Sequence, residues 1–121
     1  MDRLARGHRA ERVVADYLSA RGWEILAVNL RLGHLEIDLV ARRGELAAMI
    51  EVRSRGVGAY ERAFESIAGK KKMRLLHAAD RLWRFHLAKM EGIERMRIDV
   101  ASVTFAPDGA VVEHVEGAIT A

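Results

Sequence analysis

The stretch that decides the fold spans residues 36–53 and reads EIDLVARRGELAAMIEVR. Arg43-Gly44 near its middle is expected to turn the chain between two strands, over residues 34–42 and 45–54. Apolar and polar residues alternate through the first strand, which predicts one buried face and one polar face. Leu35, Ile37 and Leu39 are expected on the first face, and His34, Glu36 and Asp38 on the second.

The hairpin is expected to gather three carboxylates, Glu36, Asp38 and Glu51, on one face of the sheet. A two-residue turn would place Glu36 opposite Glu51, whereas a four-residue loop would place Asp38 opposite Glu51. Like charges that face each other across strands repel, so stability does not explain such a cluster. A hard divalent cation such as Mg²⁺ or Mn²⁺ would resolve the repulsion. The alternative is an exposed strand face whose carboxylates are solvated.

A carboxylate also points towards the core from the first helix, which is predicted over residues 3–21 and ends before Gly22. Glu11 falls near the middle of the apolar arc of this helix. A buried carboxylate costs several kcal/mol unless it has a partner or a cation. Glu11 is therefore expected either to pair with one of the helix's many arginines or to be a ligand of the same metal. The apolar arc consists of Leu4, Val14, Ala15 and Leu18.

The remaining elements flank this hairpin. A strand is predicted over residues 23–30, a loop begins at 56–59, a long helix covers 66–90, and two strands follow over 97–105 and 110–115. The order αβββαββ predicts an α/β sandwich with a mixed central sheet rather than a doubly wound fold. The length of 121 residues fits a single domain, 1–121. Asp99, on the first of the last two strands, is expected to pair with an arginine for structural reasons.

Composition excludes several classes of protein. The chain has no cysteine, which excludes disulfides, thiolate zinc sites and cysteine nucleophiles. No apolar run would span a bilayer or form a signal-peptide core, so a cytoplasmic protein without a membrane partner is expected. The formal charge of +3 mildly favours a polyanionic partner.

A basic cluster, Lys70, Lys71, Lys72 and Arg74, lies in the first turns of the second helix. A phosphate there would gain both from the charges and from the unbonded N–H groups of the helix terminus. The cluster is therefore a candidate for nucleic-acid binding, with a solvated basic face as the alternative.

Asp38, followed a dozen residues later by Glu51-Val52-Arg53, has the spacing of the PD-(D/E)XK nucleases. The wider sequence resembles the YraN family of bacterial proteins over nearly the whole chain. This resemblance implies a restriction-endonuclease-like three-layer sandwich similar to archaeal Holliday junction resolvases, and a predicted endonuclease activity. The segments that carry it are residues 7–11, 15–18, 22–26, 29–31, 33–41, 50–55, 65–67, 70–72 and 97–100.

The resemblance also implies a role for each site residue. Asp38 and Glu51 match the strand carboxylates that bind the metal, and Glu11 matches a helix-borne glutamate that joins them. Arg53 takes the position of the motif's lysine, and because an arginine stays protonated it would stabilise the developing charge rather than act as a base. Glu36 would position water, and Arg55 would join the basic cluster in binding nucleic acid. The family's usual Gly-Glu-Ile-Asp is varied here by one residue before the acidic pair, with Leu35 preceding Glu36-Ile37-Asp38, which leaves Glu36 and Asp38 in place.

The sequence therefore predicts an endonuclease that depends on Mg²⁺ or Mn²⁺ and acts on structured or branched DNA. The resolvase resemblance implies a homodimer, because a two-fold axis would place two sites for paired cuts. Two alternatives stay open. The chain would be a non-catalytic nucleic-acid-binding protein that retains a nuclease fold, or a protein-interaction module whose acidic cluster pairs with arginines.

Overall fold

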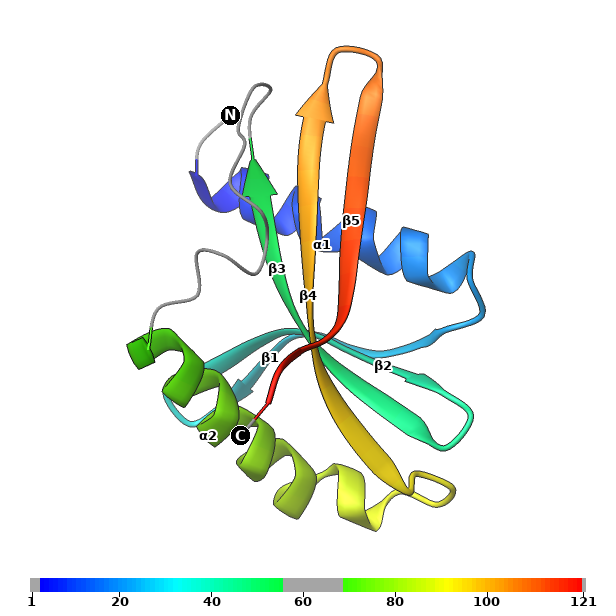
Figure 1. The fold of residues 1–121 in the computed structure, drawn as a ribbon, viewed down its shortest axis with the longest axis vertical. Helices are drawn as coiled ribbons and strands as arrows, with labels where there is room; N and C mark the ends of the chain where they lie inside the picture. Colours follow the sequence, from blue (N-terminus) through cyan, green and yellow to red (C-terminus); the bar gives the residue numbers. More distant parts are fainter. Residues whose placement is uncertain (1–2, 56–68, 121) are drawn as a thin grey trace.

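The computed structural model describes the backbone of residues 3–55 and 69–120, and the side chains of residues 8–54 and 69–120 (Figure 1). Within these residues the predicted order αβββαββ is confirmed, with one added 3-10 helix. The elements are helix α1 (Arg3–Ser19), strands β1 (Glu24–Leu32), β2 (Leu35–Arg43) and β3 (Leu46–Arg55), helix α2 (Gly69–Phe85), 3-10 helix η1 (Leu87–Lys89), and strands β4 (Arg95–Ala106) and β5 (Gly109–Ile119).

The strands form one sheet with the order β1-β2-β3-β4-β5. Strands β3 and β4 run parallel, and the other three neighbouring pairs are antiparallel. A parallel pair requires a crossover connection, and α2 lies in the segment that joins β3 to β4. The predicted mixed sheet is therefore confirmed.

Strand β3 forms part of both cores of the molecule because its residues alternate between them. Met49 packs with Leu82 of α2, whereas Ile50 packs with Val14 and Leu18 of α1. The two helices thus cover opposite faces of β3, and Figure 1 shows α1 passing behind β3, β4 and β5 while α2 lies beside β1. Each of these side chains is at most 1% exposed, and burial of one such side chain contributes about 1.5–3 kcal/mol.

The turn of the central hairpin lies one residue later than predicted. Arg43 pairs with Leu46, so the two-residue turn is Gly44-Glu45, and Gly44 has the positive φ of 62° that such turns favour. Leu39 pairs with Ile50 in this register. This is the register of the second predicted arrangement, and the pairing of the two strands ends at Leu39 and Ile50, directly before Asp38 and Glu51.

The prediction that Leu35, Ile37 and Leu39 share one face was wrong. Leu35 and Ile37 pack in the core beneath α2, whereas Leu39 packs in the core beneath α1. The change of face coincides with an irregularity opposite Asp38, where Asn29 of β1 has a left-handed φ of 53°. Such an irregularity increases the local twist of the strands and redirects their side chains.

The second helix is shorter than predicted. It ends at Phe85 rather than residue 90, because His86 leaves the helical conformation with φ −132° and ψ −60°. The bend allows Leu87 of η1 to enter the core, where it is 1% exposed. The predicted loop at 56–59 and the predicted helix start at 66–68 lie outside the described residues. No helix in the described part of the chain is long and apolar enough to cross a membrane.

Candidate functional site

A cavity of about 370 Å³ lies between the β2–β3 hairpin and α2. Its polar lining includes Glu36 and Asp38 from β2, Glu51 from β3, and Lys71 and Arg74 from α2. The second register of the hairpin brings Asp38 and Glu51 to this cavity together. The mixture of carboxylates and cations makes it the candidate functional site.

Asp38 is anchored to the neighbouring strand. The backbone N–H of Val52 donates a hydrogen bond of 2.8 Å to Asp38 Oδ2. Burial, followed by the charge of Glu51, raises the pKa of Asp38 to about 8, against the opposing effect of the Val52 hydrogen bond. The protein therefore holds a carboxyl group where its ionised form is unfavourable without a cation.

Glu11 approaches Asp38 from helix α1. Its side chain is buried, with the residue 6% exposed, and its Oε1 has no hydrogen-bond partner among the described residues. Burial raises the pKa of Glu11, while hydrogen-bonding contacts with Asp38 and Asn29 lower it. Two carboxyl groups in contact require a shared proton or a cation between them.

No arginine within residues 8–54 and 69–120 forms an ion pair with Glu11. Arg9, two residues before it, lies over the ring of Phe105 at 4.6 Å. The side chains of Arg3 and Arg6 lie outside the described residues. Among the residues that the structure describes, Glu11 therefore meets Asp38 and Asn29 rather than an arginine.

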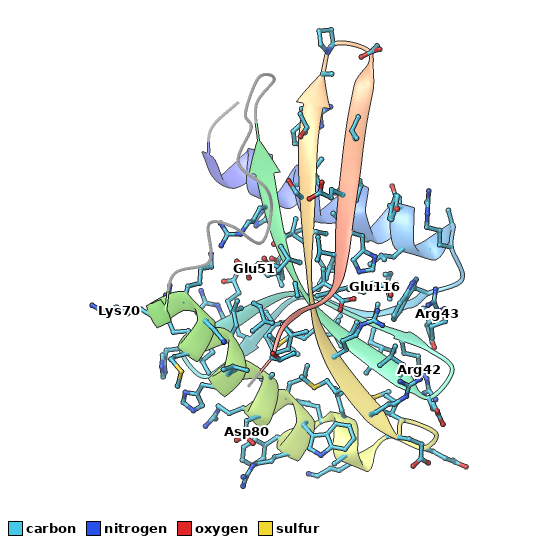
Figure 2. All side chains as sticks on the ribbon, in the orientation of Figure 1. Arg42, Arg43, Glu51, Lys70, Asp80 and Glu116 are labelled. Carbon is cyan, nitrogen blue, oxygen red and sulfur yellow. The ribbon has the colours of Figure 1, made fainter. Side chains whose placement is uncertain are left out.

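Glu51 has a cation. Lys71 Nζ lies 2.8 Å from Glu51 Oε1, and the Glu51 side chain is only 13% exposed. Figure 2 shows Glu51 between β3 and the start of α2, whereas Lys70 extends away from the protein. Neighbouring lysines of the predicted basic cluster thus lie in different environments.

The residues of the basic cluster lie on different faces of α2. Lys71 and Arg74, three residues apart and hence on one helical face, line the cavity. Lys70 and Lys72 are exposed and are absent from its lining. Arg55, the fifth residue expected to bind nucleic acid, has a side chain outside the described residues.

Of the other two predicted site residues, Glu36 lines the cavity and Arg53 does not. Glu36 lines the cavity, is exposed, and forms an ion pair of 3.7 Å with Arg31. Arg53 follows Glu51 on β3 and pairs in register with Ser102 of β4. Arg53 Nε and Nη2 are buried and have no hydrogen-bond partner within the described part of the chain. A buried guanidinium with unsatisfied donors is suited to binding an anionic oxygen.

Within residues 8–54 and 69–120, no three His, Asp or Glu side chains are already arranged as a metal-binding group. Glu11 and Asp38 contact each other, whereas Glu51 is held by Lys71. The donor chemistry nevertheless fits a hard cation, because the donors are carboxylate oxygens and one of them, on Glu11, is buried without a partner.

Asn29 is a site residue that sequence reasoning missed. It contacts Glu11 and its left-handed φ marks the irregularity opposite Asp38. An asparagine within the predicted strand over 23–30 was a usable signal, because asparagine tolerates this conformation better than most residues.

Asp99 belongs to a separate network, as expected from the sequence. Arg97 donates two hydrogen bonds to it at 2.7 and 3.0 Å, and the Gly117 N–H donates a third at 2.8 Å. His114 Nε2 lies 2.8 Å from Asp99 Oδ2. Although burial opposes them, the hydrogen bonds of His114, Arg97 and Gly117 hold the pKa of Asp99 below its ordinary value. The expected pairing of Asp99 with an arginine is confirmed.

Comparison with known proteins gives one family match. A model described as uncharacterised protein family UPF0102 matches residues 10–103. A UPF0102 protein of Sorangium cellulosum is 52% identical over 117 residues, which cover 96% of this chain and 81% of the relative. A UPF0102 protein of an Anaeromyxobacter species is 39% identical, covering 97% of this chain and 86% of the relative.

Among solved structures, the chain is similar to Pyrococcus furiosus SfsA in complex with Ca²⁺. The identity is 12% and the TM-score 0.44, with 99% of this chain and 66% of the SfsA chain covered.

Proposed function

Since this chain belongs to the protein family UPF0102, to which the YraN resemblance pointed, we propose that it is a divalent-metal-dependent endonuclease acting on structured or branched DNA. The observation that carries the proposal is the contact between Glu11 and Asp38 beside Glu51. Asp38 has a pKa raised to about 8 there, and Glu11 has an unpartnered buried oxygen. The proposal includes a restriction-endonuclease-like three-layer sandwich, which the placement of α1 and α2 on opposite faces of β3 supports.

In this proposal Asp38, Glu51 and Glu11 hold Mg²⁺ or Mn²⁺. When bound, the cation would polarise a phosphodiester and help to ionise a water molecule. Ionised Asp38 would be stabilised by the cation, which offsets the burial and the Glu51 charge that raise its pKa. Burial of the site keeps these interactions strong because little water screens them.

The remaining residues supply charge and position. Arg53 directs unsatisfied N–H groups to an anionic phosphate oxygen and stabilises the charge that develops on it. Glu36, at the exposed side of the cavity, positions water. Arg74 on the cavity lining, with the exposed Lys70 and Lys72 nearby, binds backbone phosphates of the DNA.

A second candidate function is nucleic-acid binding without cleavage. Arg53 favours it, because an arginine in the position of the motif's lysine cannot accept a proton. Both candidate functions use the same DNA-binding surface, and they differ in whether the bound DNA is cleaved.

The test is incubation of the purified protein with branched and linear DNA in Mg²⁺, Mn²⁺ or EDTA. The proposal expects metal-dependent cleavage that is lost in Asp38→Asn and Glu51→Gln and retained in Asp80→Asn, an exposed carboxylate on the far part of α2. Cleavage that persists in both site variants would overturn it. Binding that weakens steeply with salt, without any cleavage, would favour the second candidate. Loss of DNA binding as well would leave the protein-interaction module.

A further inference from the structure

Lys71 lines the cavity of the candidate site and forms an ion pair with Glu51 there. Its Nζ lies 2.8 Å from Glu51 Oε1, and its side chain is 35% exposed while that of Glu51 is 13% exposed. The cation and carboxylate come from different elements, α2 and β3, and meet at the cavity that also contains Asp38. The ammonium thus lies at a carboxylate that a metal ion would need.

The position of Lys71 on α2 is specific. Leu75 and Ala78, four and seven residues later, are buried against the sheet and also line the cavity. Lys71 therefore lies on the inward face of the helix, whereas Lys70 extends away from the protein (Figure 2). A lysine needed only for solubility or for general attraction to DNA would not require this face.

We propose that Lys71 is a displaceable cation of the metal site: it holds Glu51 in the metal-free protein and binds a phosphate of the nucleic acid once a divalent cation has taken Glu51. This inference rests on the proposed function. Lysine suits the exchange because its ammonium is a compact point charge on a flexible stem. A partly exposed side chain also has room to move towards a bound strand.

The exchange has a thermodynamic consequence. While Lys71 neutralises Glu51, an entering cation must break that ion pair, so metal affinity is lower than the carboxylates alone would give. Metal binding then makes the ammonium available for phosphate. By linkage, metal and DNA must strengthen each other's binding by the same factor.

The first experiment measures Ca²⁺ binding by isothermal titration calorimetry, with the metal alone and no DNA. Lys71→Gln is expected to bind Ca²⁺ about tenfold more tightly than the wild type, because a nearby like charge has been removed. Lys70→Gln removes the same charge one residue away and is expected to leave Ca²⁺ affinity within about twofold. Lys71→Arg keeps the charge and is expected to retain the wild-type affinity.

The outcomes separate this inference from the proposed function. If Asp38→Asn abolishes Ca²⁺ binding while Lys71→Gln leaves it unchanged or weakens it, the metal site stands and the displaceable cation is wrong. An equal gain in Lys70→Gln would also overturn the inference, because the effect would then come from net charge. If neither the wild type nor Lys71→Gln binds Ca²⁺, both the inference and the proposed metal site fall.

A second experiment measures how metal changes the affinity for DNA. Fluorescence anisotropy with labelled branched DNA is expected to show tighter binding in Ca²⁺ than in EDTA for the wild type. In Lys71→Gln this gain is expected to shrink about fivefold or more, as coupling through one contact gives, while Lys89→Gln, which removes an exposed cation outside the cavity lining, retains it. A full gain in Lys71→Gln would show that its ammonium does not bind the DNA.

Discussion

The Val52 backbone N–H donates a 2.8 Å hydrogen bond to Asp38 Oδ2. Val52 directly follows Glu51, so this bond holds Asp38 beside the neighbouring strand's carboxylate although their charges repel. Keeping the two carboxylates together therefore makes the free energy of folding less favourable.

Asp38→Asn is expected to stabilise the metal-free protein at pH 8.5. Because the folded-state pKa of Asp38 is raised to about 8 from an ordinary 3.8, its contribution to stability is full below about pH 4 and is lost as the pH rises to about 8. The neutral amide removes this loss, with a gain on the order of a few kcal/mol at pH 8.5, because a tenfold change in an ionisation equilibrium corresponds to about 1.4 kcal/mol. Urea denaturation of both proteins at pH 5 and 8.5 measures it. Equal destabilisation at both pH values would show that Asp38 carries no such strain.

Glu11→Gln is expected to weaken Mn²⁺ binding about tenfold or more, because it removes a buried carboxylate oxygen from the site. Asp16→Asn, an exposed carboxylate of the same helix, is the matched control and should leave Mn²⁺ affinity unchanged. Calorimetric titration of the folded variants gives both values. Wild-type affinity in Glu11→Gln would remove Glu11 from the set of ligands.

Arg53→Met is expected to reduce the cleavage rate by about 10²–10³ while leaving Mn²⁺ affinity within about twofold. The guanidinium stabilises charge on the substrate and binds no metal, so the two readouts should separate. Arg84→Met, at an exposed ion pair on α2, is the control. An unchanged rate in Arg53→Met, measured on DNA that the wild type cuts, would argue against a role for Arg53.

Asn29→Val is expected to destabilise the protein by about 1–2 kcal/mol, because a β-branched residue is strained at φ 53°. Asn29→Gly accepts this backbone conformation and is expected to cost less, while both variants lose the contact with Glu11. Chemical denaturation ranks the three proteins. If glycine proved as destabilising as valine, the side-chain contact rather than the backbone would govern this position.

Asp99→Asn is expected to destabilise the fold by about 3–5 kcal/mol without changing the metal site, since it breaks a buried ion pair outside the cavity. The lowered pKa of Asp99 means that its stabilising contribution is present above about pH 4 and is lost as the pH falls through the folded-state pKa. Thermal unfolding between pH 3 and 7 measures both effects, with Asp108→Asn in the exposed β4–β5 turn as control. A wild-type stability profile in Asp99→Asn would be inconsistent with the network.

Local patterns in the sequence were sufficient for the order of elements and for much of the candidate chemistry. The 3.6-residue period of the first helix placed Glu11 among its apolar residues, and the structure buries it to 6% exposure. Gly22 and Gly44 marked ends and turns to within about two residues. These features depend on neighbouring residues, which a sequence displays directly.

The tertiary structure decided which of these groups meet. Side-chain alternation left two registers for the central hairpin, and only the position of the turn at Gly44-Glu45 put Leu39 opposite Ile50 and brought Asp38 and Glu51 to one cavity. Likewise, a run of three lysines carries no information on which one faces inward until packing of the helix fixes its rotation and brings Lys71 to Glu51. Sequence by itself thus determined the elements and the carboxylates they carry, because these follow from local periodicity. The contacts of Asp38, Glu11 and Lys71 were decided only by tertiary packing, because register and helix rotation depend on residues far apart in the chain.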